Sequence, residues 1–84
     1  MPLDVIYTRL TEILREQFDD DGIVARPDLT AHEVDGWDSF AHLRLMLAVE
    51  EAFDVSFSAS QLATFKNVGE LADLIAAKTA RRDR

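Results

Sequence analysis

The chain has 84 residues, of which 48% are hydrophobic and 30% are charged, a balance that suits one small globular domain rather than a disordered segment. It contains no cysteine, so disulfides and thiolate metal sites are excluded. The net charge of −7 argues against nucleic acid and against an anionic membrane surface as partners.

The excess negative charge lies in the middle of the chain. Residues 19–54 contain ten acidic and two basic residues. Because complementary charge speeds association, this stretch predicts partners with basic surfaces.

The N-terminus shows no basic segment followed by an apolar run, and no apolar run approaches the roughly 20 residues that cross a bilayer. We therefore expect a cytoplasmic protein.

Residues 3–18 are predicted to form the first helix, because apolar residues recur at steps of three and four. Residues 19–38 then break the pattern, with a turn signal at 19–22 and with Pro27, which disfavours helix in the residue before it. This gives a first loop of about twenty residues, which is long for a compact domain. The apolar residues expected to hold the loop on the core are Ile23, Val24, Leu29, Val34 and Trp37.

Residues 39–53 are predicted to form the second helix, with Asp38 or Ser39 as its N-cap and Asp54 at its end. We expect this helix to be the most buried, because apolar residues occupy a wide part of its circumference. Those residues are Phe40, Leu43, Leu45, Met46, Leu47, Val49 and Phe53.

The last third of the chain contains an extended connector and two more helices. Residues 55–57 are too few for an independent strand, and Val55 and Phe57 are expected to be partly buried. A short helix is predicted over 58–63, with Ser58 and Gln61 forming a capping box. The last helix is predicted over 67–79, where Asn67 and Glu70 repeat that spacing, and the tail is expected to fray over 80–84.

These elements predict an all-α fold, a four-helix bundle of three main helices plus one short helix with a long first loop. We expect a single domain over residues 1–84, with an ordered core over about 3–79.

Ser39 is the most informative side chain, because it lies at the start of the second predicted helix. The free N–H groups and the dipole of a helix N-terminus favour a phosphate ester. Serine is also a common N-cap, so the position alone does not decide its role.

Ser39, His42 and Asp38 (or Asp35) supply the residue types of a hydrolase triad. However, no Gly-rich elbow surrounds the serine, and a small bundle offers little oxyanion hole or substrate pocket.

The acidic turn at Asp19-Asp20-Asp21-Gly22 is the other candidate for chemistry. It lacks the alternating ligands and the terminal Glu of a calcium-binding loop. We interpret it as a turn and expect no metal site.

The run Gly36-Trp37-Asp38-Ser39-Phe40 resembles the Asp-Ser-Leu prosthetic-group motif of acyl carrier proteins. The similarity continues through residues 48–57 and 65–71, and it covers roughly residues 3–79. The resemblance implies that Ser39, with Asp38 as its motif neighbour, receives 4′-phosphopantetheine from coenzyme A through a separate phosphopantetheinyl transferase. It also implies that the arm's thiol holds acyl groups as thioesters, so that the protein carries substrates and has no catalytic activity of its own.

The same resemblance implies that the second helix is the docking surface for acyl-loading and acyl-processing enzymes with basic patches. The docking candidates are Phe40, Arg44, Glu50, Glu51 and Asp54. The bundle interior would partly shelter an acyl chain, although core packing explains the candidate lining residues equally well. Those residues are Leu43, Met46, Leu47, Phe53, Leu62 and Leu71.

Three departures from the family pattern point to a specialised pathway. Phe40 replaces the usual Leu or Met, Ala41 stands where many fatty-acid carriers have an acidic or polar residue, and Arg44 stands where they typically have Glu. A less acidic start of the docking helix should alter partner choice more than fold.

We therefore expect a freestanding, monomeric carrier of acyl groups for a fatty-acid-like, polyketide or other specialised pathway. The alternatives are an unmodified helical protein-interaction module and a peptidyl or aminoacyl carrier. The motif around Ser39 differs from the Gly-Gly-x-Ser pattern of peptidyl carriers.

Overall fold

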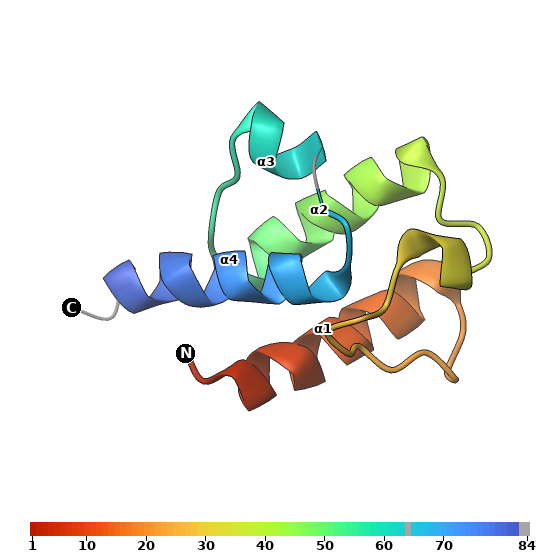
Figure 1. Ribbon diagram of the computed structural model, residues 1–84, viewed down its shortest axis with the longest axis horizontal. Helices are drawn as coiled ribbons and strands as arrows, with labels where there is room; N and C mark the ends of the chain where they lie inside the picture. The colour runs from red at the N-terminus through yellow and green to blue at the C-terminus, as the bar shows by residue number, and fades with distance from the viewer. Residues whose placement is uncertain (64, 83–84) are drawn as a thin grey trace.

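The computed structural model describes residues 1–63 and 65–82, and over these residues the chain forms helices and no strand (Figure 1). The elements are α1 (Leu3–Phe18), the 3-10 turn η1 (Ala31–Glu33), α2 (Ser39–Phe53), α3 (Ala59–Ala63) and α4 (Val68–Arg82). The predicted all-α class, with three main helices, one short helix and a long first loop, is confirmed. In this part of the chain, no helix has both the length and the apolarity that crossing a bilayer requires.

The core lies where the three long helices meet, and the start of α1 and the end of α4 lie at one end of the bundle (Figure 1). Each long helix contributes one apolar stripe, as the three- and four-residue spacing predicts. The buried residues are Ile6, Leu10, Ile13 and Leu14 from α1, Ala41, Leu45, Met46, Val49 and Phe53 from α2, and Val68, Leu71, Ala72 and Ile75 from α4.

The prediction of a wide buried face on α2 is wrong at three positions. Phe40, Leu43 and Leu47 are 73%, 51% and 57% exposed. They share one side of the helix, because residues three, four and seven apart lie above one another, and α1 packs against the opposite side, where Leu45 and Val49 are buried. Thus α2 presents an apolar stripe to solvent as well as one to the core.

The long first loop is held by hydrogen bonds between its backbone and side chains of α1, in addition to apolar contacts. Arg15 Nε donates to the carbonyl of Ile23 over 2.7 Å, and the N–H of Ala25 donates to Thr11 Oγ1 over 3.0 Å, which ties the loop to α1. Ile23, Leu29 and Val34 are buried and Trp37 is half-buried, as predicted. The prediction for Val24 is wrong, because it alternates with buried Ile23 and Ala25 and points outward.

The loop also caps the start of α4. The N–H groups of Val68 and Gly69 donate to the carbonyls of Leu29 and Pro27 over 2.9 and 3.0 Å. These are two of the first-turn N–H groups for which a helix has no acceptor of its own. The loop that precedes α2 is therefore anchored at both α1 and α4.

Local capping signals place the helix ends close to the predicted residues. Asp38, not Ser39, is the N-cap of α2, and its carboxylate accepts from the N–H of Ala41 over 2.8 Å. Ser58 and Gln61 form the predicted capping box on α3. At α4, Asn67 accepts from the N–H of Glu70.

The last helix runs to Arg82, three residues past the predicted end at 79. The predicted fraying of the tail over 80–84 is therefore wrong for 80–82, whose backbone is helical because no Gly or Pro ends the helix at 79, and residues 83–84 lie outside the described residues.

Candidate functional site

Ser39 is the first residue of α2, and its side chain is exposed. Gly36, at φ 85°, turns the chain before it, and Asp38 enters the helix in an extended conformation. The carboxylate and the carbonyl of Asp38 accept from the N–H groups of Ala41 and His42. In the described part of the chain, the N–H groups of Ser39 and Phe40 have no protein acceptor. The hydroxyl thus lies beside two open N–H donors at the positive end of the helix dipole.

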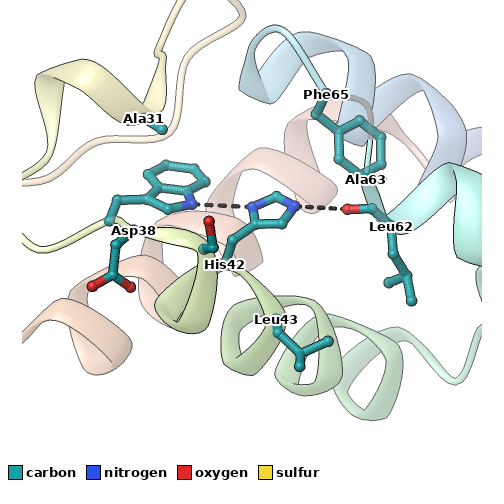
Figure 2. Close-up of a pocket in the computed structure, with 9 residues that line it drawn as sticks. Ala31, Asp38, His42, Leu43, Leu62, Ala63 and Phe65 are labelled. Carbon is teal, nitrogen blue, oxygen red and sulfur yellow. Dashed lines mark hydrogen bonds between the residues drawn. The ribbon is translucent and has the colours of Figure 1, made fainter.

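A groove of about 600 Å³ opens beside Ser39 (Figure 2). One side comes from the first loop, one from α2, and one from α3 and Phe65. The residues that line it are Ala31, Trp37, Asp38, Ser39, His42, Leu43, Leu62, Ala63 and Phe65. The site therefore combines an exposed hydroxyl with a partly aromatic surface.

His42 is half-buried in the wall of this groove, and both of its ring nitrogens are engaged. Nδ1 accepts from the Trp37 indole N–H over 3.1 Å, and Nε2 lies 2.8 Å from the carbonyl oxygen of Leu62. Because an indole nitrogen only donates and a carbonyl only accepts, the ring is neutral and carries its proton on Nε2. Neither nitrogen is free to take a proton from Ser39, so the hydrolase-triad alternative lacks its base.

The acidic turn after α1 has a structural role. Asp19 ends α1 in the left-handed conformation, and the carboxylate of Asp20 accepts from the N–H of Gly22 over 2.9 Å. Over residues 1–63 and 65–82, no group of three or more His, Asp or Glu side chains is placed to hold a metal ion.

The docking candidates occupy different environments on α2. Phe40, Arg44, Glu51 and Asp54 are exposed. Glu50 is half-buried, and its carboxylate accepts from the N–H of Phe57 over 3.0 Å, so it fastens the connector that follows α2.

The six candidate lining residues do not surround one cavity. Leu43 and Leu62 line the groove beside Ser39. Met46, Phe53 and Leu71 are buried in the packed core, and the remaining candidate, Leu47, is exposed.

Trp37, His42 and Phe65 are the groove residues whose contribution the sequence analysis missed. Their rings lie together, with centroids 6.1 Å apart for Trp37 and His42 and 6.3 Å apart for His42 and Phe65. The sequence gives no sign of the second partner of His42, because that partner is a backbone carbonyl twenty residues further on.

Ser39 thus presents an accessible hydroxyl at the N-terminus of α2, beside a histidine whose two ring nitrogens are both engaged. The chain matches the family described as "Phosphopantetheine attachment site" over residues 8–75. It is 38% identical over 73 residues to "Acyl carrier protein MbtL" of Mycobacterium bovis and of Mycobacterium tuberculosis, with 87% of each chain covered. The chain belongs to the acyl carrier protein family.

A solved relative supports the same assignment. The solution structure of a holo acyl carrier protein from Geobacter metallireducens superimposes with a TM-score of 0.83 and 41% sequence identity, covering 90% of this chain and 87% of the other. Acyl carrier proteins are non-catalytic, and their cofactor is covalently attached 4′-phosphopantetheine. The residues here fit that group, because an exposed hydroxyl, two open N–H donors and an adjoining groove lie at one helix end.

Proposed function

We propose that Ser39 is the attachment residue for 4′-phosphopantetheine and that the chain carries acyl groups as thioesters to the enzymes of a specialised biosynthetic pathway. The observation that supports it most is the exposed hydroxyl of Ser39 at the N-terminus of α2, within the region that matches the phosphopantetheine family. When bound, the cofactor supplies a thiol on a flexible arm.

The attachment step is a phosphoryl transfer to the Ser39 hydroxyl. A bond forms between Ser39 Oγ and a phosphorus of coenzyme A, the pyrophosphate bond breaks, and an adenosine bisphosphate leaves. The hydroxyl proton must go to a base of the transferase, because His42 has both nitrogens engaged. The phosphodiester that remains is negatively charged, and the open N–H groups of Ser39 and Phe40 favour such a charge.

The exposed side of α2 is the proposed docking surface for the transferase and for acyl-processing enzymes. Its first half presents the exposed apolar stripe of Phe40, Leu43 and Leu47 together with Arg44, and its end presents Glu51 and Asp54. A matching partner has an apolar surface near the attachment site and a basic patch further along α2. Replacing Arg44 by Glu should shift preference toward enzymes of fatty-acid synthesis, and identical partner kinetics for both forms would contradict this role.

The class of cargo follows from the relatives. The proteins similar to this chain are named acyl carrier proteins, which favours acyl groups over peptidyl or aminoacyl groups. The departures at Phe40, Ala41 and Arg44 favour a polyketide or other specialised pathway over general fatty-acid synthesis. The cytoplasmic location and the monomeric state expected from the sequence stay predictions.

The test is the intact mass of the protein after incubation with coenzyme A and a broad-specificity phosphopantetheinyl transferase. The wild type should gain one phosphopantetheine, and Ser39→Ala should gain none. Ser56→Ala, at an exposed serine in the connector, is the matched control and should gain the same mass as the wild type. An unchanged wild type, or an equal gain by Ser39→Ala, would refute the proposal. Full activity of Ser39→Ala in the host would favour the unmodified interaction module.

A further inference from the structure

A bridge of two hydrogen bonds crosses the wall of the groove. It runs from the indole N–H of Trp37 to His42 Nδ1, and from His42 Nε2–H to the carbonyl of Leu62, as the dashed lines in Figure 2 show. It joins three parts of the chain, namely the first loop, α2 and α3. We call these two bonds the His42 bridge. Both are partly buried, where a hydrogen bond is electrostatically stronger than in water.

The short helix α3 has fewer buried side chains to hold it than the three long helices have. It has five residues, and none of its side chains is fully buried. The three long helices are held by stripes of buried apolar residues, whereas Leu62 of α3 is only half-buried. The bond between His42 and the Leu62 carbonyl therefore fastens α3 to α2 together with the apolar contact of Leu62 with the core.

The rings at the His42 bridge line a second hollow as well as the groove. This second hollow has a volume of only about 40 Å³ and reaches buried Leu29 and Leu71 as well as exposed Lys66. Trp37, His42, Phe65 and Ala31 line both hollows. The core beyond is closely packed, with Leu45, Met46 and Val49 fully buried. A chain of methylene groups that entered the interior between α2 and α3 would have to break the bond to Leu62, because that bond joins the two helices.

We propose that His42 is a positioning residue that pins α3 to α2 and so keeps the acyl group of the loaded carrier in the groove beside Ser39, outside the core. This inference rests on the proposed attachment at Ser39. It implies that the carrier is built for short acyl groups, which the groove accommodates, and that a long chain stays accessible to solvent unless the His42 bridge opens.

Two amide substitutions separate the two halves of the bridge. In His42→Gln the longer side chain can place an amide N–H near the Leu62 carbonyl. In His42→Asn the shorter side chain can offer an acceptor to the indole of Trp37 but cannot reach Leu62. Both side chains are neutral, so the pair tests the contact with α3 rather than charge.

The first measurement uses the unmodified protein and needs no cofactor. Amide hydrogen exchange in α3 (59–63) should be about tenfold faster in His42→Asn than in the wild type, whereas His42→Gln should stay near the wild type. The ¹⁵N spectrum of the wild-type ring should show the proton on Nε2. Equal exchange in all three proteins, or a proton on Nδ1, would overturn the inference.

The second measurement uses protein loaded with acetyl or octanoyl phosphopantetheine and follows thioester cleavage by hydroxylamine. In the wild type and in His42→Gln, both thioesters should be cleaved at similar rates. In His42→Asn, the octanoyl thioester alone should be cleaved several-fold more slowly, because the chain can then enter behind α3. Strong protection of the octanoyl thioester in the wild type would overturn the inference while leaving the carrier role intact. Failure to load Ser39 would instead refute the proposed function, and the inference with it.

Discussion

Gly69 stands where α4 meets the loop that forms one wall of the Ser39 groove. A Cβ at this position would lie 2.8 Å from the carbonyl oxygen of Pro27 and 3.2 Å from its Cα. Both are backbone atoms, which cannot rotate away as a side chain can. Gly69→Ala must therefore push the loop off the helix and weaken the bonds that Val68 and Gly69 donate to Leu29 and Pro27.

The expected change is the difference between two opposing effects. Helix propensity alone would make Gly69→Ala stabilising by up to about 1 kcal/mol. Overpacking costs about 1–3 kcal/mol, and each weakened backbone bond costs up to about 1 kcal/mol more. The steric effect is larger, so we expect a net loss of about 1–3 kcal/mol in the free energy of unfolding. For a domain of this size, that loss lowers the Tm by about 5–20 °C.

Thermal and urea unfolding followed by circular dichroism measure this loss. Ala77→Gly is the matched control, because Ala77 is exposed on the same helix and reports helix propensity alone. It should lose about 1 kcal/mol. A Gly69→Ala protein as stable as the wild type, or more stable, would refute the argument that this glycine is required by the close approach of the loop.

Three further predictions concern side chains around the site. Asp38→Ala removes the N-cap of α2 and should cost about 1 kcal/mol in urea unfolding; an unchanged midpoint would contradict the capping role. The hydrogen bond from the Thr30 N–H holds the pKa of Glu33 below its ordinary value. The ionised Glu33 carboxylate therefore adds stability at a pH above the ordinary pKa of glutamate. This added stability is lost as the pH falls through the lower pKa that Glu33 has in the folded protein. The stability difference between the wild type and Glu33→Gln should therefore shrink below about pH 4, and a difference independent of pH would argue against it. Glu50→Ala should lower the free energy of unfolding, because it removes the acceptor that fastens the connector. Replacing the exposed Glu51 by Ala should change that free energy by less than about 0.5 kcal/mol. Glu51→Ala should instead slow the reactions with partner enzymes at low salt. Equal stability effects of the two substitutions would show that this division of roles is wrong.

The helices could be predicted from the sequence because their signals are local. Apolar spacing along 3–18 and 39–53 and the capping residues Asp38, Ser58 and Asn67 act within one or two turns of chain. Each predicted boundary of α1 and α2 agrees with the structure for this reason. The end of α4 was placed too early, since no capping signal stops a helix at residue 79.

Which apolar side chains are buried could be predicted only in part. Spacing shows that α2 has more apolar residues than one face needs, but it does not show which face meets another helix. Phe40 and Leu47 are exposed because α1 packs on the other side. Val24 is exposed for a similar reason, since the alternation along its segment puts Ile23 and Ala25 inside.

The sequence by itself determined the helices, the acidic middle and the position of Ser39 at a helix N-terminus, because these depend on residues close together in the chain. Tertiary structure alone decided that His42 binds Trp37 and the carbonyl of Leu62, and that the Pro27 carbonyl lies against Gly69. The contacts with Leu62 and with Pro27 join segments twenty or more residues apart and use backbone carbonyls, which every residue type shares. These contacts therefore cannot be predicted from residue types or spacing, and they form only when the helices pack.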